Sequence, residues 1–180
     1  MRKLLTVLFT IGMLYSVQAQ TFDDSIYHEK KVFSNQDATV DKMHKVATFV
    51  FYGKALDHIG YEFNNTFKQF YHGDFSISFE HGLERKEDAV GVSYAGNNDC
   101  KVDIKIDADA WRNYSTLQKM WLVFHELGHD VLNLKHTKTG LMMPNIPKDT
   151  KITTQKLFRA LTGALEIARK EESYNKYPCN

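Results

Sequence analysis

The hydrophobic and polar positions of the chain change period along its length. Over residues 39–59 apolar residues recur at steps of three and four, the spacing of one helix face, and Gly60 supplies a stop. Apolar and polar residues then alternate over residues 75–79 and over Lys101–Asp107, while residues 89–94 form a short, mostly apolar stretch. These three segments predict strands. The alternation over Lys101–Asp107 is typical of an antiparallel hairpin with one face in water.

Helical patterns return in the second half of the chain. Ser115, followed by Gln118, predicts a capping box that starts a helix, and we expect Gly128 within this helix to allow the close approach of another backbone. Residues 153–172 predict a second amphipathic helix. Strands followed by helices predict an α+β fold, in which a small twisted sheet buries the apolar face of the first of these helices. That face consists of Leu117, Met120, Trp121, Phe124, Leu127 and Val131.

Residues 1–19 have the three regions of a secretory signal peptide. Arg2 and Lys3 are the positive start, residues 4–15 are the apolar run, and residues 17–19 fit a cleavage site. The apolar run is too short to span a bilayer, so we expect a secreted or periplasmic protein without a stable membrane anchor. Residues 20–180 then form a single domain, in which residues 20–36 are an N-terminal arm or a short pro-segment.

Charge and composition exclude several classes of partner. The 23 basic and 22 acidic residues nearly balance, and loss of Arg2 and Lys3 changes the net charge from +1 to about −1. A chain without a basic excess is not expected to bind nucleic acid or an anionic membrane surface. The sequence has no internal repeat and no low-complexity tract, and we expect a monomer built from one domain.

Cys100 and Cys179 are the two cysteines of the chain. An even pair in an exported protein predicts a disulfide, which would tie the C-terminal tail to the central region. Two unpaired thiols are the alternative. Neither cysteine has the spacing of a metal site.

The candidate chemistry lies in residues 125–136, HELGHDVLNLKH. Two histidines four apart on a helix point from the same face, so His125 and His129 can reach one Zn²⁺. Glu126 can lie beside the metal without binding it and act as a general base on water there. Asn133 tolerates the left-handed conformation that ends many helices, and a turn at this residue would offer His136 as a third ligand. Three protein nitrogens and an open position describe a catalytic zinc site rather than a structural one.

The other histidines have no such spacing. We expect His44 and His58 to be ordinary surface or boundary residues of the first predicted helix. Nothing in the sequence favours His72 or His81 as ligands.

HELGH, a helix-ending residue, a third histidine and then Gly-Leu-Met-Met-Pro at residues 140–144 resemble the metzincin metallopeptidases. The signature of that family is H-E-x-x-H-x-x-G-x-x-H followed by a methionine turn, and the turn here is most similar to the matrixin version. The chain departs from the signature in two ways. Asn133 stands in place of the glycine, and one extra residue lies between His129 and His136. The clear match covers residues 115–144.

The resemblance implies a zincin-like α+β fold with a small mixed sheet, a zinc-binding active-site helix and a closing C-terminal helix. It places Met142 below the metal and implies a secreted zinc-dependent endopeptidase that acts on peptides or proteins. Zn²⁺ held by His125, His129 and His136 would polarise the scissile carbonyl. Glu126 would take a proton from water and pass it to the leaving amine.

Two other functions stay open. In a gluzincin-type peptidase the HELGH helix is kept, and Glu166 on the last predicted helix is the third ligand. The other alternative is a non-catalytic secreted binding domain that retains the zinc fold. The intact Glu126 argues against the binding domain, because a purely structural site has no use for a general base.

We also expect a peptide substrate to pair as an added strand with an exposed sheet edge. Lys101–Asp107 fits this edge best, because its outward face is charged and charges on an edge discourage pairing with other chains. In the alternative, this strand is central and residues 89–94 form the edge.

Overall fold

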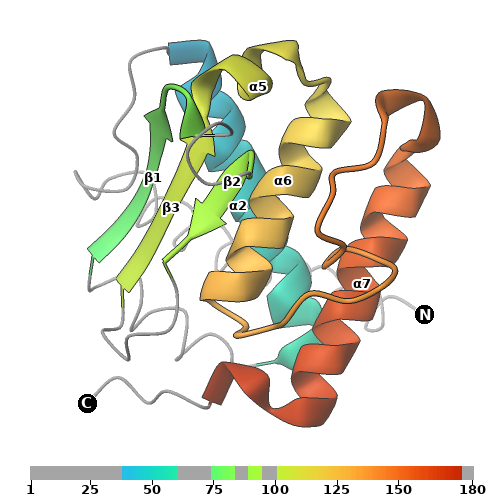
Figure 1. Ribbon diagram of the computed structural model, residues 1–180. Coiled ribbons are helices and arrows are strands. Elements are labelled where there is room, and N and C mark those ends of the chain that lie inside the picture. The colour runs from blue at the N-terminus through green and yellow to red at the C-terminus, as the bar shows by residue number, and fades with distance from the viewer. Residues whose placement is uncertain (1–37, 61–73, 84–88, 95–100, 176–180) are drawn as a thin grey trace, which may run out of the picture. The chain divides into compact units, whose positions relative to one another are not determined.

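The computed structural model describes residues 38–60, 74–83, 89–94 and 101–175, all of which lie in one compact unit, residues 33–180. These residues combine helices with a small mixed sheet, which confirms the predicted α+β class. The predicted signal peptide, the N-terminal arm and both cysteines lie outside the described residues. The elements follow in the order α2 (Ala38–Ile59), β1 (Asp74–Glu80), β2 (Gly91–Ser93), β3 (Lys101–Asp107), α5 (Ala108–Asn113), α6 (Thr116–Asp130) and α7 (Thr154–Glu171), with 3-10 turns at Asp149–Lys151 and Ser173–Asn175 (Figure 1).

β3 is the central strand of the three-stranded sheet, whose order is β1-β3-β2. β2 pairs antiparallel with β3, from Gly91 opposite Ile106 to Ser93 opposite Ile104, as the alternation predicts. β1 pairs with the other side of β3 and runs parallel to it. The prediction that Lys101–Asp107 forms an open edge is therefore wrong, because both sides of this strand are paired. Among the described residues, the outer side of β2 is an edge of the sheet, and it lies beside α6 (Figure 1).

The core lies between the sheet and α6. Val102, Ile104 and Ile106 of β3 are fully buried, as the alternation predicts, and each such side chain stabilises the fold by about 1.5–3 kcal/mol. α6 contacts β2, β3, α2 and α7, so it is the element around which the described residues pack (Figure 1). Toward α2, the rings of Phe51 and Phe124 have centroids 6.0 Å apart.

Side chains and positive φ angles fix the helix ends. The Ser115 hydroxyl accepts from the Gln118 N–H at 3.4 Å and the Gln118 Oε1 accepts from the Ser115 N–H at 3.1 Å, so the predicted capping box is present. Gly60 ends α2 with a φ of 89°, and Asn133 follows α6 with a φ of 52°. α7 starts after Thr153 and ends before Glu172, close to the predicted bounds.

His44 is not the surface or boundary residue that its sequence context predicts. It is fully buried on α2, stacks on Phe79 with ring centroids 4.7 Å apart, and meets the edge of Trp111 at 4.6 Å. Trp111 belongs to α5, a six-residue helix for which the sequence made no prediction. The Asp107 carboxylate caps α5 by accepting from two backbone N–H groups, and this helix brings Trp111 over the histidine.

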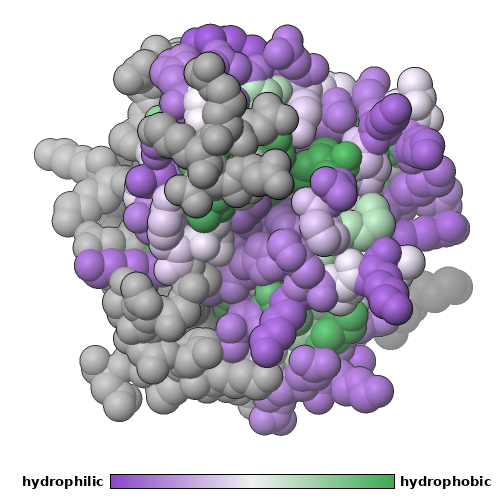
Figure 2. Space-filling view, viewed as in Figure 1, coloured by the Kyte–Doolittle hydropathy of each residue, from purple (hydrophilic) through white to green (hydrophobic). Residues whose placement is uncertain are grey.

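None of the described helices is both long and apolar enough to cross a bilayer. The described residues on the face seen in Figure 2 are mostly hydrophilic, with apolar residues in separate small patches. The exposed large apolar side chains among the described residues are Val46, Tyr94 and Ile167. Single exposed apolar residues are normal on protein surfaces and do not by themselves mark an interface.

Candidate metal centre

α6 places the first two histidines of the motif on one face. His125 and His129 are one turn apart, and their Nε2 atoms lie 3.1 Å from each other. His125 is 5% exposed, while His129 is half-buried. Glu126 comes from the next position around the helix and is 3% exposed. Two imidazoles and a carboxylate therefore come from one largely buried stretch of α6.

The turn after α6 returns the chain toward these histidines. The Leu132 N–H bonds the Leu127 carbonyl at 3.4 Å, one residue further back than in a regular helix. Asn133 follows in the predicted left-handed conformation, and the Leu134 N–H closes the turn on the Gly128 carbonyl at 3.0 Å. This widened turn lies between His129 on α6 and His136 beyond it.

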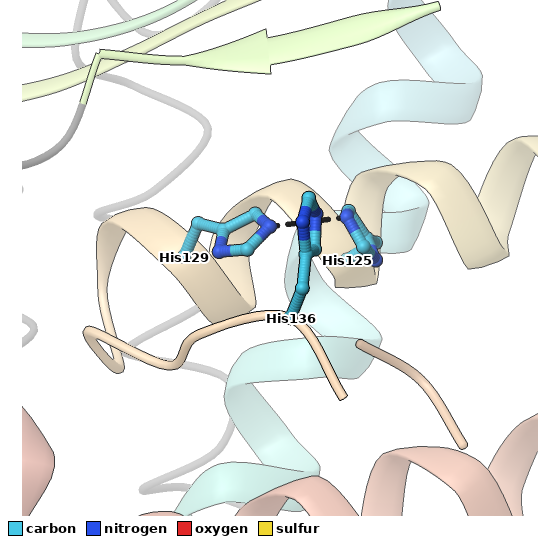
Figure 3. Close-up of side chains that lie close together, drawn as sticks. All are labelled: His125, His129 and His136. Carbon is cyan, nitrogen blue, oxygen red and sulfur yellow. Dashed lines mark hydrogen bonds between the residues drawn. The ribbon is translucent and has the colours of Figure 1, made fainter. Parts of the chain in front are cut away.

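His136 lies beside the two helix histidines (Figure 3). One ring nitrogen from each of His125, His129 and His136 lies within 4.8 Å of the others. The ring centroid of His136 is 5.3 Å from that of His125 and 4.6 Å from that of His129. The three predicted ligands are thus brought together, and this cluster could hold a metal ion.

Backbone carbonyls determine which nitrogen of each helix histidine carries the proton. The Nδ1–H of His125 donates to the Leu141 carbonyl at 2.8 Å, and that of His129 donates to the Leu134 carbonyl at 2.6 Å. A carbonyl can only accept, so each Nε2 presents a lone pair. Two lone pairs that face each other at 3.1 Å repel unless a cation lies beside both. Tetrahedral zinc with bonds of about 2.0–2.1 Å holds two nitrogens about 3.3 Å apart, so the residues fit this metal.

Burial keeps both helix histidines in the neutral form that binds metals. Desolvation lowers the pKa of His125 to about 4, although its bond to the Leu141 carbonyl opposes the change. Desolvation also lowers the pKa of His129, and the Leu134 carbonyl opposes it in the same way. At neutral pH neither ring has to lose a proton before it binds a cation.

The Gly-Leu-Met-Met-Pro segment packs against α6. Gly140 has a φ of 84°, which turns the chain, and Leu141 and Met142 are both buried. A Cβ on Gly128 would lie 2.6 Å from the Sδ atom of Met142, so a side chain at this position would force the sulfur to shift. The neighbour of Gly128 is therefore a side chain and not the second backbone that the sequence predicts.

Glu126 lies against the edge strand β2. A Cβ on Gly91 would lie 2.5 Å from the Oε1 atom of Glu126 and 2.7 Å from the Cδ1 atom of Leu122, so strand and helix meet closely because Gly91 has no side chain. The Ser93 N–H donates to the Glu126 carboxylate. Desolvation first, and the nearby Asp130 carboxylate second, raise the pKa of Glu126 to about 8, while the Ser93 bond opposes them.

A cleft of about 610 Å³ opens over the histidines. Residues 89–93, which include β2, form one wall, and residues 144–146, after the methionine turn, also line the cleft. The Gln118 side chain donates to the Pro147 carbonyl at 3.2 Å, so the capping box also ties this second segment to the start of α6. The cleft therefore lies between an edge of the sheet and the three histidines.

The structure does not bring Glu166, the alternative third ligand, to the cluster. Its side chain is exposed on α7, and the three histidines are the one group of potential ligands that meets in the part of the chain that the structure describes. His81 lies in an exposed pair with Asp109 at 3.6 Å, away from the cluster. His72 is outside the described residues.

Sequence reasoning missed the groups that support the site. The carbonyls of Leu134 and Leu141 orient the histidines, and the N–H of Ser93 binds Glu126, but every residue carries such backbone groups. One signal was available, because Gly91 interrupts a short apolar strand, and a glycine in a strand often marks a close approach of other atoms.

No family model, curated protein or solved structure matches the chain.

Proposed function

We propose that this protein is a secreted zinc-dependent endopeptidase of the metzincin type. The proposal is carried by the facing Nε2 lone pairs of His125 and His129, 3.1 Å apart, with His136 beside them and the Glu126 carboxylate in the same cleft. Three histidine nitrogens leave one position of tetrahedral zinc open, as in catalytic zinc sites. Export rests on the sequence of residues 1–19 alone.

Each group of the chain has its own task in peptide hydrolysis. Zinc, when bound, polarises the scissile carbonyl and lowers the pKa of water. The carbonyls of Leu134 and Leu141 hold His129 and His125 through Nδ1–H and so keep both Nε2 atoms free for the metal. Glu126 accepts the proton of the attacking water and delivers it to the leaving amine.

Glu126 has to be ionised to accept this proton. Burial and the Asp130 carboxylate raise its pKa to about 8 in the chain alone. A divalent cation at the neighbouring histidines favours the carboxylate form, so metal binding lowers this pKa toward neutrality. A base whose pKa lies near the working pH can both take up and release a proton.

The substrate peptide is proposed to lie along the outer side of β2. Its three residues, Gly91–Ser93, line the cleft over the histidines, whereas both sides of β3 are paired within the sheet. An extended peptide binds such an edge through main-chain hydrogen bonds, and the pockets beside it select side chains.

The Glu126→Gln variant tests the function. Glutamine keeps the size of the side chain and can still accept from the Ser93 N–H, but it cannot take up a proton. We expect the cleavage rate of a mixed peptide pool to fall by about 10²–10⁴-fold with zinc content unchanged. The rate is measured by mass spectrometry of the products, and zinc is measured by atomic emission.

Glu166→Gln is the matched control, because Glu166 is exposed on α7 and should not affect the rate. Wild-type rates in the Glu126→Gln variant would refute the mechanism. A zinc-loaded wild-type protein that cleaves no peptide would favour the non-catalytic binding domain.

A further inference from the structure

β2 bonds to β3 through alternate residues. The Val90 carbonyl accepts from the Asp107 N–H at 2.9 Å, and the Tyr94 N–H donates to the Asp103 carbonyl at 3.0 Å. In an antiparallel pair, residues that form such bonds alternate with residues that do not. The residues between Val90 and Tyr94 that do not bond to β3 therefore direct their N–H and C=O groups to the outer side of β2.

Gly91 and Ser93 are these residues, so their backbone groups form the open edge beside the cleft. One group of this edge is already engaged, since the Ser93 N–H donates to the Glu126 carboxylate. Gly91 permits the contact, because a Cβ at this position would lie 2.5 Å from the Oε1 atom of Glu126. The edge that would receive a peptide is thus in direct contact with the proposed general base.

We propose that the Ser93 N–H is a shared donor, bound to Glu126 in the free protein and to a carbonyl of the peptide when substrate lies on β2. The exchange releases one hydrogen bond from the Glu126 carboxylate when a peptide is in place. This inference rests on the proposed function, because it requires a peptide on the outer side of β2. It makes the Ser93 backbone a positioning group for the base.

Sharing has a consequence for affinity. A hydrogen bond to a carboxylate is stronger than one to a neutral carbonyl, so a peptide has to displace a strong acceptor to pair with Ser93. Removing that acceptor should therefore tighten peptide binding. Loss of a side chain that simply contacts substrate has the opposite effect.

The test compares Glu126→Ala with Glu126→Gln. Both variants lack the base and leave the probe uncleaved, and both are neutral, but only glutamine retains an oxygen that accepts from the Ser93 N–H. The probe is a fluorescein-labelled decapeptide chosen from the pool that the wild type cleaves. We expect the zinc-loaded Glu126→Ala variant to bind the decapeptide about tenfold more tightly than the zinc-loaded Glu126→Gln variant does. Tenfold is about the value of one net hydrogen bond, and fluorescence anisotropy measures the affinity.

The hydrogen-exchange rate of the Ser93 amide, measured by NMR, tests the sharing without any cleavage of substrate. The Ser93 amide should be protected in the wild type and in Glu126→Gln, exchange faster in Glu126→Ala, and become protected again when the decapeptide is added. Gly91→Ala is a second variant, because its Cβ would displace the Glu126 carboxylate and should also speed this exchange.

Equal affinities of the two Glu126 variants, with unchanged Ser93 exchange, would refute the shared donor and leave the proposed function intact. If the wild type cleaves no peptide of the pool and neither Glu126 variant binds the pool, the proposed function and the sharing are refuted together.

Discussion

At the scale of single residues, His44 illustrates how surroundings fix the charge of a side chain. It is fully buried between the rings of Phe79 and Trp111. Desolvation lowers its pKa to about 3, and the positive charge of Lys119 contributes in the same direction. The ring is therefore neutral in the folded protein throughout the range in which an exposed histidine gains its proton.

His44 makes the stability of the fold depend on pH. The unfolded chain takes up a proton at this residue below about pH 6.5, whereas the folded chain does so only near pH 3. Stability is thus unaffected above pH 6.5 and is lost as the pH falls from 6.5 toward 3. When the pH is lowered from 7.5 to 5, we expect the wild type to lose about 2 kcal/mol more of its free energy of unfolding than the His44→Phe variant, which has no imidazole to protonate at this position.

Urea unfolding of both proteins at the two pH values measures this change. The comparison removes the contribution of other titrating groups, which the two proteins share. If the difference in stability between wild type and His44→Phe stays constant with pH, the lowered pKa of His44 is contradicted.

Among the histidines, the positions of some could be predicted from the sequence and the burial of another could not. His125 and His129 could be predicted because helix geometry alone decides which residues share a face. His136 could be predicted because Asn133 tolerates a left-handed turn. The burial of His44 could not be predicted, since it depends on Trp111 from a helix more than sixty residues later in the chain.

At the scale of elements, the sequence identifies strands more readily than their neighbours. β3 has the predicted bounds, Lys101–Asp107, because its period of two reports the burial of one face. Its parallel pairing with β1 joins Asp74 to Lys101, and no local pattern encodes so distant a partner. Lys101–Asp107 was wrongly predicted to be an open edge because its pairing with β1 could not be recognised from the sequence. α5 was missed because six residues are too few for a helical period to be recognised.

The turn at Asn133 is the element on which the third histidine depends. Alanine tolerates its φ of 52° less well than asparagine or glycine. We expect Asn133→Ala to lower the free energy of unfolding by roughly 1 kcal/mol and, by displacing His136, to weaken zinc binding by about tenfold. Asn133→Gly should retain both properties. Competition with a chromophoric chelator measures the affinity.

Gly60 supplies the control for this prediction. It ends α2 with a φ of 89°, a conformation in which an L side chain is strained, and it is not part of the histidine cluster. Gly60→Ala should lower the free energy of unfolding by about 1–2 kcal/mol and leave zinc affinity unchanged. A loss of affinity as large as that of Asn133→Ala would mean that the effect comes from general destabilisation.

At the scale of the whole molecule, the histidine cluster joins the central helix to an irregular segment. His125 and His129 belong to α6, whereas His136 lies in the segment between α6 and α7, which has no α-helix or strand. A ligand that binds the folded chain and not the unfolded one stabilises it by mass action. Zinc bound by all three histidines would therefore link α6 to this segment.

Zinc removal should lower the melting temperature by on the order of 10 °C. Metal at about a thousand times its dissociation constant contributes about 4 kcal/mol, and each kcal/mol shifts the melting temperature of a domain this size by about 2–4 °C. Scanning fluorimetry with a chelator, and again after zinc is returned, checks this. His136→Ala should lose most of the shift and Glu166→Ala should keep it. The reverse pattern would favour Glu166 as the third ligand.

The close fit of Met142 against Gly128 has a consequence for oxidation. A sulfoxide adds a polar oxygen to the thioether, but the Met142 side chain is 2% exposed and its sulfur fills the space beside Gly128. The Met142 carbonyl also accepts from the Thr137 N–H at 2.9 Å, next to His136. We therefore expect peroxide to oxidise this sulfur faster when the segment that carries His136 is displaced.

Half-buried Met143 is an internal reference for the same experiment. Mass spectrometry of peroxide-treated protein should show Met142 oxidised more slowly than Met143, and the difference should shrink when a chelator removes zinc. Equal rates in the zinc-loaded protein would contradict the fit described here. The oxidation rate of Met142 would then report how often the segment that carries His136 is displaced from α6.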